Sequence, residues 1–324
     1  MKLSCSRVNN YSSAQLNNLE VINMAAPKRT ILITGCSDGG LGAGLALAFH
    51  KAGWRVIASA RNLAKLKEVT DAGIETIQLD TVSDDSIAAA VAAVSSLTGG
   101  SLDALLNNAG SGYSMPVLDV DIEKGKKLFD LNVWSVITVT RAFLPLLFKS
   151  THPYGGLIVN NTSLSSIPGA GLPFQVTYSA SKAAATQFTE GLRLELEPFG
   201  IKVVNLVTGS VKSPFYGNAG FEKLPPNSLY GLAKDVIEAK MNGENHAKDA
   251  EDRDVWAVGV VASLGKKNPS HWIYSGRFST LVKYGQHLPI GTFDSMSKSM
   301  VGLDVFEKKL KEQGGPKAVI GKLD

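Results

Sequence analysis

Residues 30–44 read TILITGCSDGGLGAG, a short apolar run that leads into a glycine-rich turn. The run TILIT (30–34) predicts a buried strand, and the apolar periodicity from Leu41 to Lys51 predicts a helix directly after the turn. Glycines at such a junction let the backbone approach a pyrophosphate, and the helix N-terminus offers N–H donors and partial positive charge. The stretch therefore predicts a dinucleotide-binding turn, although a tight turn without a ligand would have the same pattern.

The alternation of strand and helix continues along the chain. Further strands are predicted at 55–59, 74–79, 102–107, 157–162, 201–207 and 271–276, and further helices at 62–70, 83–97, 121–148, 177–197, 228–241 and 253–264. The strand runs lack polar alternation, which is typical of parallel strands covered on both faces. We therefore expect an α/β fold with a single doubly wound parallel sheet of the Rossmann type over residues 28–276. A C-terminal helical segment follows at 277–324.

Composition narrows the classes of function. Lys and Arg number 33 against 29 Asp and Glu, the formal net charge is +4, and no long basic block occurs. Nucleic-acid binding is therefore not indicated. The only two cysteines, Cys5 and Cys36, do not suggest a disulfide framework, which favours a cytoplasmic protein. The histidines are scattered without ligand spacing, so no metal site is expected.

The N-terminal residues 1–27 are rich in Ser and Asn and lack the apolar core of a secretory signal. We expect them to be a disordered extension, or to precede the natural start of the chain, for which Met24 is the candidate. No membrane span is predicted, because the most apolar stretch, 133–148, is short and is interrupted by Arg141 and Pro145.

The end of the second predicted strand indicates which dinucleotide the turn would bind. NAD-preferring sites place Asp or Glu there to bind the ribose 2′-hydroxyl, whereas this chain reads ASARN (58–62). The guanidinium of Arg61 matches a 2′-phosphate in a bidentate manner, which favours NADP(H) over NAD(H). The alternative is that Arg61 is a solvated surface residue. Asp80, at the end of the third strand, is expected either to bond the adenine or to cap the next turn.

Two later motifs carry the candidate chemistry. Asn107-Asn108-Ala109-Gly110 follows the fourth predicted strand, and Tyr178-Ser-Ala-Ser-Lys182 lies near the start of a predicted helix. Because they are four residues apart, Tyr178 and Lys182 share one helix face. A tyrosine with a pKa of about 10 is a poor acid–base group at neutral pH, and we expect the nearby ammonium to lower that pKa. The alternative is two unrelated surface residues.

Together with the glycine-rich turn and Asn132, these motifs resemble the short-chain dehydrogenase/reductase family. The resemblance implies that Tyr178 donates a proton to a carbonyl oxygen and that Lys182 also binds the nicotinamide ribose. It implies that Asn132 holds a water in a proton relay and that Val211 and Ser213 contact the carboxamide. The full expected cofactor-binding set is Gly35, Ser37, Gly40, Leu41, Gly42, Arg61, Asp80, Asn108, Arg141, Tyr178, Lys182, Val211 and Ser213.

The resemblance covers roughly residues 28–215 and is imperfect at two turns. Four residues separate Gly35 from Gly40 where the family usually has three, so Gly39 competes with Gly40 for the motif position. The Pro-Gly pair that usually follows the sixth strand is replaced by Thr208-Gly209.

The catalytic serine has two candidates. Counting forward from the strand residue Asn160 selects Ser163, whereas counting back from Tyr178 selects Ser165. We prefer Ser163, because loops change length more readily than strands slip in register.

Within the family, the segments TGCSDGGLG (34–42) and LPFQVTYSASKAA (172–184) and the long tail most resemble two groups of fungal enzymes. These are NADPH-dependent 1-acyldihydroxyacetone-phosphate reductases and secondary-metabolite ketoreductases. We therefore expect an NADP(H)-dependent oxidoreductase that interconverts a ketone and a secondary alcohol on a lipid-like or polyketide-like molecule. The alternatives are a non-catalytic NADP(H) sensor and a lipid-surface binding protein on the same fold.

The tail and two long helices bear on partners. An apolar stripe recurs in the tail at helical spacing: Phe293, Met296, Met300 and Leu303. We favour a lid over the substrate pocket, and the alternative is peripheral contact with an endoplasmic reticulum or lipid droplet surface. The predicted helices 121–148 and 177–197 have surplus apolar surface, and the resemblance implies that they pair across a two-fold axis in a homodimer or homotetramer.

Overall fold

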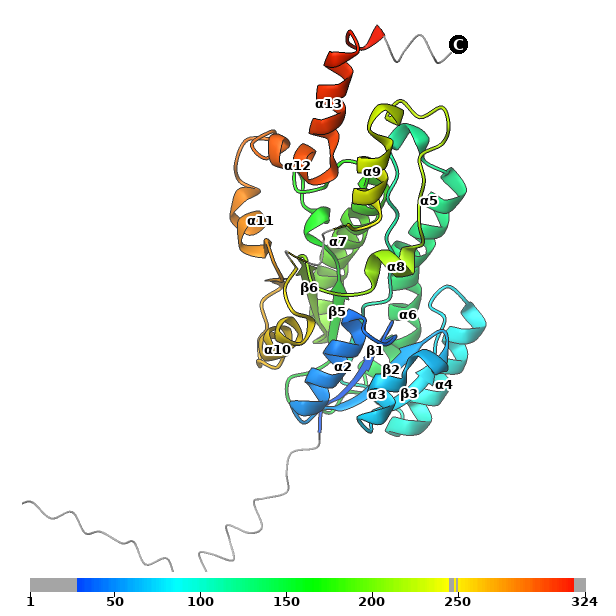
Figure 1. Cartoon of the computed structure of the whole chain (residues 1–324). Helices are drawn as coiled ribbons and strands as arrows, with labels where there is room; N and C mark the ends of the chain where they lie inside the picture. The colour runs from blue at the N-terminus through cyan, green and yellow to red at the C-terminus, as the bar shows by residue number, and fades with distance from the viewer. Residues whose placement is uncertain (1–27, 245–247, 249, 318–324) are drawn as a thin grey trace, which may run out of the picture.

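Parallel strands form one seven-stranded sheet in the computed structural model, which describes residues 28–244, 248 and 250–317 (Figure 1). The strand order is β3-β2-β1-β4-β5-β6-β7. The bounds are β1 Thr30–Ile33, β2 Arg55–Ala60, β3 Glu75–Gln78, β4 Ala104–Asn107, β5 Leu157–Asn161, β6 Lys202–Thr208 and β7 Trp272–Ser275. The predicted parallel sheet is confirmed, and every strand bound lies within two residues of its prediction. The predicted extension 1–27 lies outside the described residues.

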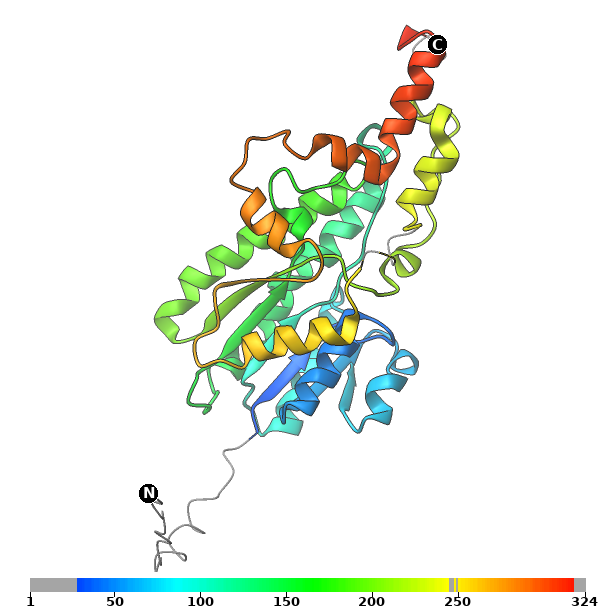
Figure 2. The ribbon, with the colours of Figure 1, turned by 60° about the vertical axis from the view of Figure 1, so that its left-hand side comes forward.

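Helices cover both faces of the sheet, because successive residues of a strand point to opposite sides. Ile31 and Ile33 of β1 are buried on one face with Trp256, whereas Leu32 is buried on the other with Phe143. On the first face α2 and α10 lie side by side (Figure 2). The first face is covered by α2 (Leu41–Lys51), α3 (Lys67–Asp71) and α10 (Arg253–Leu264). The second face is covered by α4 (Asp84–Thr98), α6 (Ser135–Leu147) and α7 (Val176–Leu196).

The position of β1 determines where a ligand can enter. The chain first adds β2 and β3 on one side of β1 and then places β4 on its other side. Doubly wound sheets bind ligands at the carboxyl edge beside such a switch point. The glycine-rich turn leaves β1 at this edge.

The C-terminal residues form short helices near the carboxyl edge of the sheet (Figure 1, orange to red). Val301 is buried with Ile237 of α9, and Gly302 lies so close to α9 that a Cβ there would be 2.7 Å from Val236 Cγ1. The predicted C-terminal helical segment is thus confirmed, and it packs onto α9. The helices of this part are α8 (Phe215–Ala219), α9 (Lys234–Met241), α11 (Ser279–Gly285), α12 (Asp294–Val301) and α13 (Leu303–Glu312).

The long helix predicted at 121–148 is interrupted. After α5 (Ile122–Phe129), the residues Asp130–Trp134 form a π-helical turn, and α6 continues from Ser135. Short π-helical turns are frequent at functional sites, and this one contains Asn132.

Candidate active site

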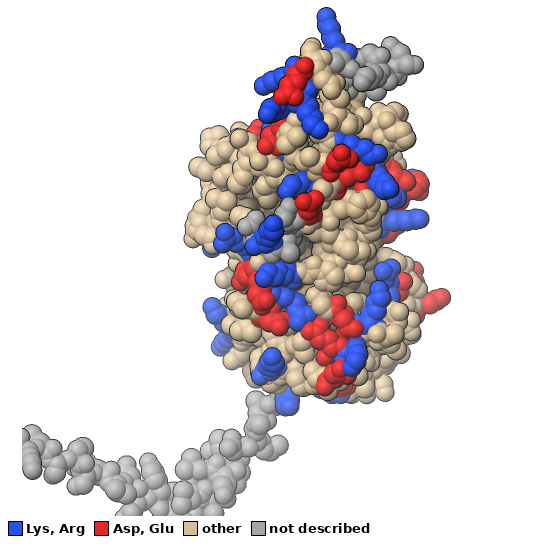
Figure 3. Space-filling model, in the orientation of Figure 1, with Lys and Arg blue, Asp and Glu red and all other residues tan. Residues whose placement is uncertain are grey.

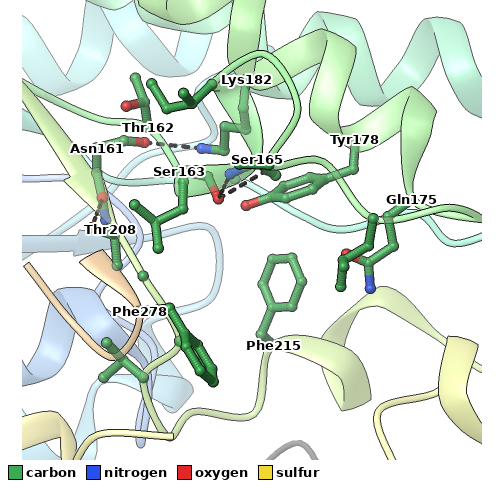
Figure 4. A pocket seen from close by; sticks show the side chains of 18 of the residues that line it. Asn161, Thr162, Ser163, Ser165, Gln175, Tyr178, Lys182, Thr208, Phe215 and Phe278 are labelled. Carbon is green, nitrogen blue, oxygen red and sulfur yellow. Dashed lines mark hydrogen bonds between the residues drawn. The ribbon is translucent and has the colours of Figure 1, made fainter. Parts of the chain in front are cut away.

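A cavity of about 730 Å³ opens at the carboxyl ends of the central strands (Figure 4). A volume in this range is typical of small-molecule and cofactor sites. The cavity brings together these predicted residues: Gly35, Ser37, Gly40, Leu41, Arg61, Asn108, Ser163, Tyr178, Lys182, Val211 and Ser213. Four predicted residues are not on its surface: Gly42, Asp80, Asn132 and Arg141.

The glycine-rich turn forms a part of the cavity wall where side chains cannot fit. Gly35 has a φ of +72°, and a Cβ on it would lie 2.8 Å from Ala109 Cα. A Cβ on Gly42 would lie 2.4 Å from the Gly35 carbonyl oxygen. Gly40 precedes α2 and lines the cavity, whereas the N–H of Gly39 donates a hydrogen bond to Glu68 outside it. The geometry therefore favours Gly40 as the residue beside a bound phosphate.

A row of hydrogen-bonded side chains crosses the strand ends beneath the cavity. Thr34 Oγ1 accepts from the Asn108 backbone N–H at 2.9 Å. Asn161 Nδ2 donates to Asn108 Oδ1 at 2.9 Å, and Thr208 Oγ1 donates to Asn161 Oδ1 at 2.6 Å. The row fixes Asn108, and it includes Asn161 and Thr208, which the sequence prediction missed. The only feature of the sequence that could have indicated these two residues is that each is a polar residue at the end of a predicted apolar strand.

Tyr178 and the two candidate serines meet at the centre of the cavity (Figure 4). Ser163 Oγ accepts hydrogen bonds from Ser165 Oγ at 3.0 Å and from the Ser165 backbone N–H at 3.2 Å. A side-chain hydrogen bond also joins Ser163 to Tyr178. The Tyr178 ring packs edge-on against Phe215, with 5.4 Å between ring centroids. This arrangement favours Ser163 as the serine beside the reacting oxygen, with Ser165 behind it.

Burial sets the protonation states of Tyr178 and Lys182. Burial raises the pKa of Tyr178 to about 12, although the hydrogen bond with Ser163 works in the opposite direction. Burial lowers the pKa of Lys182 to about 8. The expectation that Lys182 lowers the tyrosine pKa is therefore wrong for this structure, because desolvation of the phenolate is the larger effect. At neutral pH the site presents a protonated phenol.

Lys182 is held at the floor of the cavity. Its side chain is only 7% exposed, and Nζ donates a hydrogen bond to the Asn161 carbonyl oxygen at 2.9 Å. Within the described residues this is its only hydrogen-bond acceptor. An ammonium has three donors, so two remain for a ligand in the cavity.

Asn132 lies behind the cavity wall. It is 1% exposed, and its amide pairs with the backbone of Ser111, accepting from the N–H and donating to the carbonyl oxygen, both at 2.9 Å. It also donates to Ser181 Oγ at 3.0 Å, and that hydroxyl donates to the Tyr178 carbonyl oxygen. The π-helical turn thus ties Asn132 to the helix that carries Tyr178.

Two cations line the end of the cavity beside β2. Arg61 follows β2 directly, and Lys65 lies four residues later in a short 3-10 helix. Both are exposed, and no ion pair engages either side chain among the described residues. The sequence prediction missed Lys65, although its spacing from Arg61 was the available signal.

Neither Asp80 nor Arg141 lines the cavity, although both were predicted to bind the cofactor. The Asp80 carboxylate accepts from the Val82 backbone N–H at 3.2 Å, so it caps the following turn, which was the second of the two expectations. Arg141 is exposed on α6, whose buried side, including Phe143, faces the sheet. The structure therefore removes Arg141 from the predicted cofactor set.

The outer wall of the cavity is apolar. It comes from the loop after β5, from Phe215 and Phe278, and from the segment spanning α11 and α12. Leu281, Leu288 and Ile290 line it and remain between 42% and 80% exposed. The outer surface around α11 and α12 is also largely uncharged (Figure 3). The segment spanning α11 and α12 therefore borders the cavity, which is the position that a lid over the substrate pocket requires.

The residues present fit a nicotinamide dinucleotide. Gly35 and Gly40 line the cavity at the N-terminus of α2, where backbone N–H groups suit a pyrophosphate. Arg61 and Lys65 line the end beside β2 with no ion-pair partner in the described chain, and the Lys182 ammonium has two donors left. Within the described part of the chain, no group of three His, Cys, Asp or Glu side chains is placed to hold a metal ion.

Comparisons with known proteins identify the family of the chain. The family model for short chain dehydrogenases matches residues 29–223. A short-chain dehydrogenase/reductase of Pestalotiopsis microspora is 44% identical over 89% of this chain and 99% of its own length. The NADPH-dependent 1-acyldihydroxyacetone phosphate reductase of Schizosaccharomyces pombe is 34% identical over 85% of this chain and 94% of its own length.

A solved structure gives the same picture. The crystal structure of a short-chain dehydrogenase from Streptomyces avermitilis superposes with a TM-score of 0.69 at 25% identity, covering 88% of this chain and 98% of that one. The family model and the relatives thus confirm the resemblance seen in the motifs, and the fold agrees with it: the chain is an oxidoreductase that belongs to the short-chain dehydrogenase/reductase family.

Proposed function

We propose that this enzyme uses NADPH to reduce a ketone to a secondary alcohol on an apolar, lipid-like or polyketide-like molecule. The observation that carries the proposal is the position of the Tyr178 hydroxyl. It lies in one continuous cavity between the glycine-lined compartment and the apolar outer wall, with Ser163 and Lys182 beside it.

Arg61 and Lys65 support NADPH as the cofactor. A 2′-phosphate at the ribose end would meet two cations that have no ion-pair partner in the described chain, and no carboxylate lines that end of the cavity. A guanidinium binds a phosphate through two parallel hydrogen bonds. The Schizosaccharomyces pombe relative is itself named as NADPH-dependent.

The chain's own residues account for the proton side of the reaction. NADPH, when bound, supplies a hydride to the carbonyl carbon. The Ser163 hydroxyl donates a hydrogen bond to the carbonyl oxygen and fixes its position. The Tyr178 phenol, with its pKa raised to about 12, is protonated at neutral pH and donates its proton to that oxygen. The Lys182 ammonium, which gives one of its three donors to the Asn161 carbonyl oxygen, holds the nicotinamide ribose with the others.

The proton must then be replaced. We assign this to a relay through a water held by Asn132, whose amide is fixed by the Ser111 backbone and by Ser181. Near pH 7 Tyr178 is in the protonated form that reduction needs, whereas oxidation would need the phenolate that burial disfavours.

A single substitution tests the proposal. Tyr178→Phe removes the proton and keeps the ring against Phe215, so kcat should fall by about 10²–10⁴-fold. NADPH binding, followed by cofactor fluorescence, should be unchanged. Turnover at the natural rate with a panel of lipid and polyketide ketones would contradict the assigned role.

We further propose that the chain forms a homodimer or homotetramer. Trp134, Phe188 and Leu194 are 40–59% exposed, and Trp134 packs against Phe188. These residues belong to the segments 121–148 and 177–197 that were expected to pair, which supports an interface there. A monomeric mass in light scattering at micromolar concentration would contradict it.

The proposed location is cytoplasmic, with the lid interpretation preferred over contact with a membrane surface. None of the described helices is long and apolar enough to cross a bilayer. Co-sedimentation with anionic liposomes at low salt and release by high salt would favour peripheral contact through α11 and α12 instead.

A further inference from the structure

The charged residues of the cavity lie away from its outer wall. Among the described lining residues only Arg61, Lys65 and Lys182 carry charge. The first two lie at the ribose end, and Lys182 lies at the floor. The lining that comes from residues 164–175 and 278–300 contains no Asp, Glu, Lys, Arg or His.

Three cations on the segments that form this wall do not reach the cavity lining. The Arg277 guanidinium stacks on the Phe278 ring at 5.4 Å, and Lys283 Nζ lies 5.5 Å from the Tyr284 ring centroid. Lys298 pairs with Glu307 at 2.7 Å. None of these three cations lines the cavity.

Two polar side chains in the wall donate hydrogen bonds to backbone carbonyl groups of their own segment. Gln286 Nε2 donates to the Lys283 carbonyl oxygen at 2.8 Å. Thr292 Oγ1 donates to the Pro289 carbonyl oxygen at 2.7 Å. What faces the substrate is therefore mostly aliphatic, aromatic and thioether surface.

We propose that the substrate is an uncharged ketone whose apolar body lies under α11 and α12, and that the enzyme discriminates against ketones that carry a phosphate. This inference rests on the proposed function and adds the substrate class. A phosphate lying against this wall would meet no cation and would lose hydration wherever the wall covers it, which is unfavourable. Met296 and Met300 in the wall adapt their shape to apolar bodies of different outline.

A matched pair of substrates tests the proposal. The octanoyl ester of dihydroxyacetone and its phosphate ester differ only in the phosphate, and diacetyl serves as a small ketone that needs no outer wall. NADPH oxidation should give a kcat/KM at least about a hundredfold higher for the uncharged ester, as expected for an unpaired buried charge.

Two variants of α12 sharpen the test. Met296→Lys places an ammonium in the compartment and should lower kcat/KM for the uncharged ester while raising it for the phosphate ester. Ser295→Lys adds the same charge to the same helix outside the cavity lining, and it should change neither value.

The outcomes separate the two proposals. If diacetyl and both esters are untouched, the proposed ketone reduction fails. If diacetyl is reduced but the phosphate ester is used as well as the uncharged ester, or if neither ester is used, the reduction stands and the substrate class is overturned.

Discussion

The floor and the outer wall of the cavity are built on different physical principles. The floor is a row of hydrogen bonds between residues at the ends of adjacent strands, such as Asn108, Asn161 and Thr208. The wall is made of apolar side chains on α11 and α12, which have seven and eight residues. Hydrogen bonds at strand ends fix atoms in place, whereas short helices joined by Gly and Pro can change between relatives.

This difference separates catalysis from selection. Under the proposed function, Tyr178 and Ser163, which stand over this floor, meet the reacting oxygen of every substrate, so changes there should lower kcat for all ketones. Groups in the wall touch only the part of the substrate remote from the reaction and should act mainly on KM for bulky ketones. The following substitutions test the separation.

The largest effect is expected at the serines beside Tyr178. Ser163→Ala removes the hydrogen bond to the reacting oxygen, so kcat should fall by about 10²–10³-fold with small and bulky ketones alike. Ser165→Ala should cost about tenfold or less, because Ser165 acts by orienting Ser163. Steady-state NADPH oxidation measures both. A larger loss for Ser165→Ala would reverse the two roles.

The ribose end should respond next. Arg61→Asp repels a 2′-phosphate and removes one charge-assisted contact, so the ratio of kcat/KM with NADPH to that with NADH should fall about ten- to a hundredfold. Lys65→Ala should lower the same ratio by less, since Arg61 remains to bind the 2′-phosphate. An unchanged ratio in both variants would place these residues on the solvated surface.

The wall should show a smaller and more selective effect. The Phe293 ring lies where a Cβ on Gly285 would be 2.8 Å away, so it closes the joint between α11 and α12. Phe293→Ala should raise KM for bulky apolar ketones about tenfold, because part of their buried surface is lost. Turnover of diacetyl is the internal control and should not change. A matching loss with diacetyl would show that floor and wall are coupled.

The smallest effect is a pH dependence at Lys182. Its pKa is lowered to about 8, so the ammonium is charged below pH 8 and loses its proton as the pH rises above it. NADPH should therefore bind about threefold more weakly at pH 9.5 than at pH 7, since one favourable charge interaction disappears. Lys182→Met should bind weakly at both pH values. A fluorescence titration that gives equal affinity for the natural enzyme at both would contradict this.

The local signals in the sequence were sufficient for the fold. Apolar runs without polar alternation gave the seven strands within two residues, because a strand covered on both faces needs apolar residues at every position. The pair Tyr178 and Lys182 was readable for a similar reason, since the helical repeat alone places residues four apart on one face. The glycine turn at residues 34–44 was readable because it must exclude side chains.

Other features depended on contacts between distant segments. The sequence placed Arg141 among the cofactor contacts and gave Lys182 control of the Tyr178 pKa, and the structure overturned both. Helix rotation turns Arg141 to the exposed side of α6, and desolvation by surrounding elements governs the tyrosine. Asn161 meets Asn108 only because β4 and β5 are neighbours across 53 residues of chain.

By itself the sequence determined the order of strands and helices, the glycine-rich turn after β1 and the placement of Tyr178 and Lys182 on one helix face, because each follows from residues within one element or one junction. Tertiary structure alone decided which serine lies beside Tyr178, which cations reach the ribose end and which residues form the uncharged wall. Those choices depend on how loops of variable length pack together, and burial and distance between such loops are not encoded in any local period.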